Sequence, residues 1–161
     1  MLLVLAALVA LVLAGRAAAA PDGPADVGQV VRVVDGDTIH VELDGRREKV
    51  RYIGVDTPES VKPGTPVQCF AKRASAFNER LVAGEKVRLV LDAEERDRYG
   101  RLLAYVYRRR DNLFVNATLV TGGYAVPLTI PPNVAHAKEF RILAATARRK
   151  GRGLWSSCRS S

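Results

Sequence analysis

The sequence predicts a β-rich α+β fold, in which five strands form a small barrel and three helices pack against it. Three observations predict this class. Five short segments rich in β-branched and aromatic residues are separated by turn sequences. A helical segment interrupts them after the third strand, and two more follow the fifth, so strands and helices do not simply alternate. Small, partly open barrels of this kind commonly bind oligonucleotides on one face.

The first three strands precede the first helix. We expect them at Gln29–Val34, Thr38–Leu43 and Lys49–Val55. Apolar and polar residues alternate through the second of these segments, which is the period-two pattern of a strand with one buried face. The sequence Asp-Gly-Arg-Arg-Glu at residues 44–48 predicts the turn between the second and third strands.

The first helix follows a loop that is rich in proline, glycine, serine and threonine, at residues 58–66. Its apolar residues Phe70, Ala74, Phe77 and Leu81 recur at spacings of four, three and four, which places them on one helical face. Gly84 is positioned to end this helix. The remaining elements are two strands at Lys86–Leu91 and Arg101–Tyr107, a short helix at Asn116–Thr121 and a last helix at His136–Arg149.

The chain opens with an apolar segment that predicts export. Leu2–Leu13 is a run of 12 apolar residues, short for a bilayer span but typical of a secretory signal, and small residues follow at Ala17–Ala20. We expect a signal peptide at residues 1–19, cleaved after Ala19, and a secreted or periplasmic protein. Because no lysine or arginine precedes the apolar run, an uncleaved membrane anchor is the alternative. Residues 20–28 are expected to be a flexible leader, residues 29–158 one domain, and residues 159–161 a tail.

The charge of the chain indicates the kind of partner. The formal net charge is +8, and removal of the signal peptide with Arg16 lowers it to +7. A small exported domain with this excess attracts polyanions, with nucleic acid first and anionic membranes second. The alternative is a basic surface that serves solubility alone.

The two cysteines, Cys69 and Cys158, fit no zinc-binding spacing. In an oxidising compartment they could form a disulfide that ties the C-terminal tail to the body of the domain. Two independent buried thiols are the alternative.

Three short stretches carry the candidate chemistry: Asp-Gly-Asp-Thr at residues 35–38, Arg-Tyr-Ile-Gly-Val-Asp-Thr-Pro-Glu at 51–59, and Asp-Arg-Tyr-Gly-Arg at 97–101. Asp37 and Asp56 offer the hard carboxylate oxygens that Ca²⁺ or Mg²⁺ requires. Only two histidines are present and no His-Glu-x-x-His motif occurs, which argues against zinc chemistry and a Ser-His-Asp hydrolase.

The basic and acidic residues around these acids could act on a phosphate. Arg51 and Arg101 could each present a planar fork of donors, and Glu59 could accept a proton from an attacking water. Simpler interpretations exist for each stretch. Asp35 with Gly36 is expected to shape a turn, Arg51 could be a solvated strand residue, and Glu59 could belong to a helix start.

In this order, and together with Gly-Leu-Trp at residues 153–155, the three motifs resemble the staphylococcal (thermo)nuclease family over residues 29–155. The resemblance implies a five-stranded OB-fold barrel with three helices. It also implies a calcium-dependent enzyme that cleaves DNA and RNA at the bond between phosphorus and the 5′ oxygen, leaving 3′-phosphate ends. We expect single-stranded substrates to be preferred, and nothing in the sequence requires more than a monomer.

The resemblance also implies a role for each motif residue. Calcium would be bound by the carboxylates of Asp37 and Asp56 and by the backbone carbonyl of Thr57. Glu59 would be the general base. Arg51 and Arg101 would clamp the scissile phosphate. Arg98 and Tyr99 would lie beside the bound nucleotide.

One position departs from the family pattern. The family often has a tyrosine before the last helix that stacks on the nucleotide base, and the alignment puts Leu128 there, with Tyr124 the nearest aromatic residue. Two other functions compete with a nuclease. One is a non-catalytic nucleic-acid-binding OB module, and the other is a protein that binds another polyanion or hydrolyses a small phosphodiester.

Overall fold

A computed structural model describes residues 25–60, 63–64 and 66–158. The expected signal peptide and the tail at residues 159–161 lie outside the described residues. Within the described part of the chain, no helix is long and apolar enough to cross a membrane.

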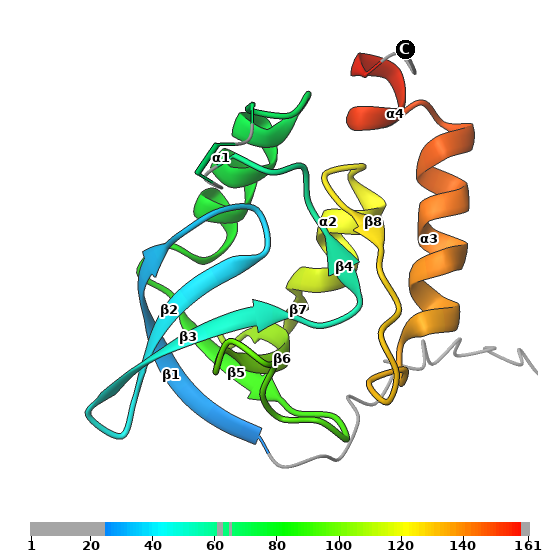
Figure 1. Cartoon of the computed structure of the whole chain (residues 1–161). Helices are drawn as coiled ribbons and strands as arrows, with labels where there is room; N and C mark the ends of the chain where they lie inside the picture. Colours follow the sequence, from blue (N-terminus) through cyan, green and yellow to red (C-terminus); the bar gives the residue numbers. More distant parts are fainter. Residues whose placement is uncertain (1–24, 61–62, 65, 159–161) are drawn as a thin grey trace, which may run out of the picture.

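Five strands form a closed barrel, which confirms the predicted fold class (Figure 1). The antiparallel order is β3–β2–β1–β5–β6, and a parallel pairing of β3 with β6 closes the barrel, with Val50 opposite Leu102. Their bounds are β1 Ala25–Val33, β2 Thr38–Leu43, β3 Arg46–Tyr52, β5 Lys86–Val90 and β6 Leu102–Arg108. Three two-residue strands complete the sheets: β4 Val55–Asp56, which pairs with β8 Val126–Pro127, and β7 Leu113–Phe114 beside β6.

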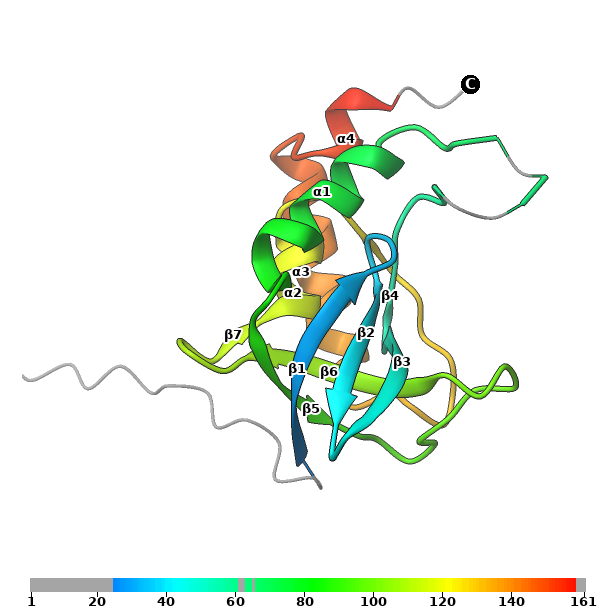
Figure 2. The ribbon, with the colours of Figure 1, turned by 90° about the vertical axis from the view of Figure 1, so that its left-hand side faces the viewer.

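The three expected helices are α1 Ala71–Val82, α2 Val115–Thr121 and α3 Ala137–Arg149. A fourth helix of one turn, α4 Leu154–Ser157, was not predicted. Helix α1 lies at one end of the barrel, and α3 lies on the side away from β1 and β2 (Figures 1 and 2). The outer face of β1, β2 and β3 therefore has no described helix packed over it.

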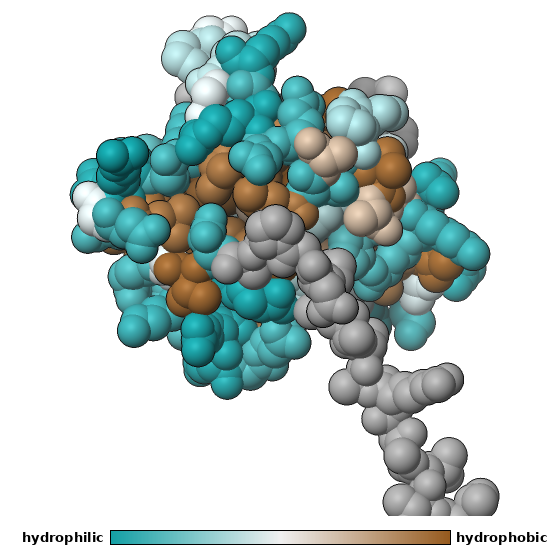
Figure 3. All heavy atoms as spheres, turned by 90° about the horizontal axis from the view of Figure 1, so that it is seen from below, coloured by the Kyte–Doolittle hydropathy of each residue, from teal (hydrophilic) through white to brown (hydrophobic). Residues whose placement is uncertain are grey.

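The barrel core consists of the inward side chains of the strands, including fully buried Ile39, Val41 and Leu89. Phe140 of α3 joins the same core. Burial of such aliphatic and aromatic side chains is the main stabilising contribution to a domain of this size. Seen from below, the molecule has hydrophobic atoms in the middle of the face and hydrophilic side chains around them (Figure 3).

Three expected boundaries are wrong. The third strand, expected at Lys49–Val55, is β3 Arg46–Tyr52, and Val55 begins β4 after a turn. Strand β1 begins at Ala25, so residues 25–28, assigned above to the flexible leader, pair with β5. A side chain at Gly28 would meet Val41 at 2.3 Å, so the glycine permits a close approach within the sheet instead of marking a loose segment. The turn between β2 and β3 contains only Asp44 and Gly45, both with positive φ, because a two-residue turn of this kind matches the strand twist.

Candidate active site

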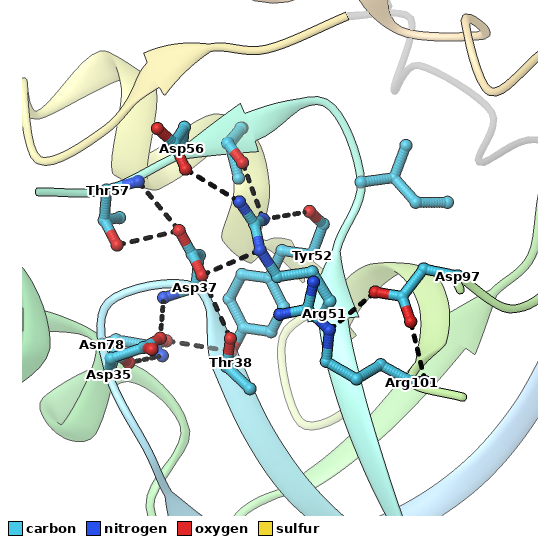
Figure 4. A network of polar contacts seen from close by, with 12 residues as sticks. Asp35, Asp37, Thr38, Arg51, Tyr52, Asp56, Thr57, Asn78, Asp97 and Arg101 are labelled. Atoms are coloured by element: carbon cyan, nitrogen blue, oxygen red, sulfur yellow. Dashed lines mark hydrogen bonds and ion pairs between the residues drawn. The ribbon is translucent and has the colours of Figure 1, made fainter. Parts of the chain in front are cut away.

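The three sequence motifs converge on one cavity of about 220 Å³ (Figure 4). The corner between β1 and β2 supplies the first motif, and the pairing of β2 with β3 sets Thr38 opposite Arg51. The closing pairing of β3 with β6 brings in the third motif, which immediately precedes β6. The cavity is lined by Asp35, Asp37, Thr38, Arg51, Asp56, Thr57, Pro58, Glu59 and Arg101.

Asp37 is the buried centre of this network, with 5% of the residue exposed. Its Oδ2 accepts hydrogen bonds from the backbone N–H and the hydroxyl of Thr57, both at 2.8 Å. Its Oδ1 accepts the hydroxyl of Thr38 at 3.1 Å and faces Nε of Arg51 at 3.1 Å. A carboxylate has about four acceptor positions, so Asp37 is fully engaged by the protein.

Arg51 joins the two aspartates expected to bind metal. Besides its contact with Asp37, it donates through Nη1 to the carbonyl oxygens of Tyr52 and Val55, at 2.7 and 2.8 Å. Nη2 donates to Oδ1 of Asp56 at 2.9 Å. The side chain is only 13% exposed, so the interpretation of Arg51 as a solvated strand residue is wrong. Four of its five N–H groups have protein acceptors in this state, and a paired contact with phosphate requires exchange with Asp56, which is half-exposed.

Asp35 shapes the corner, as the sequence predicts, because its Oδ1 accepts the backbone N–H of Asp37 at 3.0 Å. It also faces the cavity, where burial and the neighbouring charge of Asp37 raise its pKa to about 6. Gly36 has a further role. A Cβ atom there would lie 2.6 Å from Oγ1 of Thr57, so the glycine allows Thr57 to reach Asp37.

The charge and chemistry of the lining fit a divalent cation. Four carboxylates and two guanidinium groups face the cavity, formally a net charge of −2. Burial raises the pKa of the Asp56 carboxyl, Arg51 counteracts it, and the charges of Asp37 and Glu59 add to the increase. Carboxylate oxygens are typical calcium ligands, so the residue types fit this ion. The described residues contain no closely gathered group of three or more His, Cys, Asp or Glu side chains. Because the four acceptor positions of Asp37 are engaged by protein donors, a cation on Asp37 would have to displace one of them.

The loop that carries Glu59 is held at both ends. The Glu59 N–H donates to Oε1 of Gln68 at 2.8 Å, and the Gln68 N–H donates to the Glu59 carbonyl at 3.0 Å. The next residue, Cys69, forms a disulfide with Cys158, with the two Cα atoms 5.9 Å apart. The alternative of two separate thiols therefore does not hold. The disulfide attaches the start of α1 to the end of α4.

Arg101 is oriented by Asp97, the first residue of the third motif, to which the sequence analysis assigned no role. Oδ2 of Asp97 lies 2.6 Å from Nε of Arg101, and Oδ1 accepts the backbone N–H groups of Tyr99 and Arg101 at 2.9 and 3.0 Å. Burial raises the pKa of Asp97, but its bonds with Arg101 outweigh that effect and hold the pKa below its usual value. Asp97 is the first residue of a tight turn, a position where aspartate commonly accepts backbone hydrogen bonds, and this could have indicated its role from the sequence.

A second cavity of about 490 Å³ adjoins the first, and both Arg51 and Arg101 line the two. Arg98 and Tyr99 lie in its wall, where Nη2 of Arg98 donates to the Tyr99 hydroxyl at 2.6 Å and the Tyr99 residue is 68% exposed. Leu128 also lines this cavity. Tyr124, the aromatic residue nearest to it in the expected alignment, does not line this cavity.

Tyr124 instead belongs to the helical layer. Its ring stacks on that of Phe77 with centroids 3.9 Å apart and planes inclined by 7°. No aromatic side chain other than Tyr52 and Tyr99 lines the larger cavity among the described residues. Of the two residues considered for the stacking position, Leu128 lines the larger cavity and Tyr124 does not.

Asn78 is a buried residue behind the site that the sequence analysis did not identify. Asn78 on α1 has no exposed surface; its Nδ2 donates to the carbonyl of Asp35, and its Oδ1 accepts the hydroxyl of Tyr52, both at 2.9 Å. It therefore fixes the corner that positions Asp37. The available signal was a polar residue in the apolar face of a helix, four residues from both Ala74 and Val82.

The closed five-stranded barrel, with an acidic cavity beside an arginine-lined groove, defines an OB-fold protein. Residues 49–157 match the family described as "Staphylococcal nuclease homologue", and the chain belongs to that family.

Its relatives include nucleases. The chain is 43% identical over 129 residues to "Thermonuclease" of Staphylococcus hyicus, covering 80% of this chain and 75% of that protein. It is 47% identical over 121 residues to "Thermonuclease" of Staphylococcus intermedius, covering 75% and 68%. It is 42% identical over 127 residues to "Endonuclease YncB" of Bacillus subtilis, covering 78% and 59%. These relatives support a nucleic-acid hydrolase.

Proposed function

We propose that this protein is an exported, calcium-dependent nuclease that hydrolyses DNA and RNA at the bond between phosphorus and the 5′ oxygen. The observation that carries the proposal is the convergence of four carboxylates and two arginines in one cavity that adjoins a groove. The names of the relatives, thermonuclease and endonuclease, support the same reaction class. Export rests on the apolar N-terminal segment alone.

The acids of the cavity would hold calcium through the carboxylates of Asp37 and Asp56 and the carbonyl of Thr57. When bound, the ion supplies positive charge that polarises the phosphate. Glu59 accepts a proton from the water whose oxygen attacks phosphorus. The bond from phosphorus to the 5′ oxygen breaks and that oxygen takes up a proton, so the products carry a 3′-phosphate and a 5′-hydroxyl.

The two arginines stabilise the charge that develops on the phosphate oxygens. Arg101 is already fixed by Asp97, whereas Arg51 has to release Asp56 before it can make a paired contact with the phosphate. Preorganised donors of this kind contribute strongly, since removal of one typically lowers the rate by about 10²–10³.

The larger cavity would hold the nucleotide next to the scissile phosphate. Tyr99 offers an exposed ring for contact with a base, with Arg98 beside it. Leu128 gives an apolar contact without ring stacking, so we expect weak base preference. An unpaired base enters such a groove without the energy of unstacking a duplex, which favours single-stranded substrates. The protein is proposed to act as a monomer.

The deciding experiment compares wild-type protein, starting at Ala20, with Glu59→Ala and a matched control, Glu79→Ala, on the exposed side of α1. Single-stranded DNA is incubated with calcium or with excess chelator, and the fragment ends are determined. We expect calcium-dependent fragments that end in 3′-phosphate, and a loss of about 10²–10⁴ in rate for Glu59→Ala only.

Two outcomes would contradict the proposal. Binding without cleavage would favour the non-catalytic nucleic-acid-binding module. Near-normal turnover by a correctly folded Glu59→Ala protein would remove Glu59 from its role as the base.

A further inference from the structure

The outer face of the sheet formed by β1, β2 and β3 carries basic side chains that lead away from the active site. Side chains alternate along β3, with Val50 and Tyr52 buried in the core. Arg47, Lys49 and Arg51 therefore share the opposite face. Neighbours on one face of a strand are about 7 Å apart, which is comparable to the spacing of phosphates along an extended nucleic-acid strand.

Basic residues also lie side by side across strands β1, β2 and β3. Register pairs place Arg32 of β1 opposite His40 of β2, and His40 opposite Lys49 of β3. We call Arg32, His40, Lys49 and Arg47 the cationic face. Across the sheet, His40 is therefore the residue between Arg32 and Lys49.

Basic side chains outnumber acidic ones on this face. Within the described ranges, no ion pair involves Arg32, Arg47 or Lys49, whereas Arg96 is paired with Glu48 on the same barrel. The one acid in register with this face is Glu42, opposite Arg47. The local potential is positive: burial lowers the pKa of His40, and the charges of Lys49, Arg32 and Arg47 lower it further.

This surface is open to a ligand. Arg32, Arg47 and Lys49 are exposed, and His40 is partly exposed. Figure 2 looks toward the three strands and shows α1 beyond their end and the other helices behind them. A strand whose scissile phosphate lies at Arg51 can thus continue along β3 without crossing a helix.

We infer that the cationic face binds the phosphodiester backbone of a single nucleic-acid strand to one side of the scissile phosphate. The inference rests on the proposed nuclease function and adds to it a second binding surface, with Lys49 as the first contact beyond Arg51. It predicts that the protein distinguishes long strands from fragments too short to reach the face.

The test measures equilibrium binding of the protein to fluorescent oligothymidylates of 30 and 4 nucleotides. Binding is measured in excess chelator at a series of salt concentrations. The triple variant Arg32→Gln/Arg47→Gln/Lys49→Gln is compared with Arg141→Gln/Arg149→Gln/Lys150→Gln. The control removes the same charge from exposed positions at α3, away from β1 and β2. Urea unfolding establishes that both variants are folded.

For the triple variant, the slope of log K against log salt concentration for the 30-residue strand should become shallower by about 2, since each single-strand phosphate contact contributes about 0.7. Its affinity for that strand should fall by roughly 100-fold at 0.1 M salt if the affinities converge at 1 M. The loss should be much smaller for the 4-residue fragment and for the control variant.

A second readout follows the His40 ring by NMR. The chain has two histidines, and His136 is the internal reference. Binding of the 30-residue strand should raise the pKa of His40 and leave the His136 resonances in place.

Equal salt slopes and affinities for the two variants, or an unmoved His40 resonance, would overturn the inference. A failure of the proposed catalysis would be seen differently, as wild-type protein that cleaves nothing with calcium. The binding comparison would still decide the role of the cationic face, because it is made without turnover.

Discussion

Removal of the disulfide between Cys69 and Cys158 is expected to lower the free energy of unfolding by about 4 kcal/mol. The two cysteines are 89 residues apart in sequence. In the chain-entropy description, a cross-link over a loop of this size removes about 4.6 kcal/mol of freedom from the unfolded chain at 25 °C. Residual structure in the unfolded state reduces that figure, so we expect a loss of about 3–5 kcal/mol.

The measurement is urea unfolding of wild-type protein and Cys69→Ser/Cys158→Ser. The fluorescence of Trp155, the only tryptophan, reports the C-terminal helix directly, and far-ultraviolet circular dichroism reports the barrel. For a slope of about 2 kcal/mol/M, the midpoint should fall by about 2 M urea. A reductant should move the wild-type curve to that of the variant and leave the variant curve unchanged.

A midpoint shift below about 0.5 M with an unchanged slope would refute the reasoning. It would mean that the cross-link does not restrict the unfolded chain. If Trp155 fluorescence alone shifted while the barrel signal did not, the disulfide would hold only the C-terminal helix.

Arg51→Lys should lower turnover of single-stranded DNA by about 100-fold or more, because an ammonium cannot span the two carboxylates that the guanidinium joins; a rate within about threefold of wild type would contradict this. Asp35→Asn should raise the free energy of unfolding at pH 7.5 in chelator, by up to about 3 kcal/mol, because the raised pKa of about 6 shows that the folded state disfavours the charged carboxylate. The folded protein binds the additional proton as the pH falls through 6 toward 4, so urea titrations should show the gain disappearing below about pH 4, and a pH-independent gain would exclude this cause. Gly36→Ala should lower stability by about 1–3 kcal/mol and weaken calcium-dependent cleavage, because the new methyl group displaces Thr57 from Asp37; wild-type urea curves and activity would contradict the packing argument.

Local patterns in the sequence determined most of the elements. The apolar spacing from Phe70 to Leu81 predicts a helix that the structure has at Ala71–Val82, and the pattern near the C-terminus predicts α3 within one residue at its start. These patterns succeed because helix and strand periodicity depend only on near neighbours. The motif residues were likewise recognisable from their order, and all three motifs contribute to one cavity, while Arg98 and Tyr99 line the adjoining one.

Features that depend on residues far apart in the sequence were decided by the tertiary structure. Gly28 belongs to a strand because it pairs with Val87 of β5, and the close approach of Val41 leaves no room for a side chain there. Asn78 supports Asp35 across 43 residues of sequence, and no local pattern indicates that pairing.

The parallel closure of β3 on β6 decided the site itself. It unites Arg51 and Arg101 in one lining, while the contacts of Arg51 show that it first organises Asp37 and Asp56. The sequence determined which chemical groups are available, since composition and motif order are written in it. Their distances, donors and pKa values were decided by the fold, because hydrogen bonds and desolvation depend on atoms that approach only when the barrel closes.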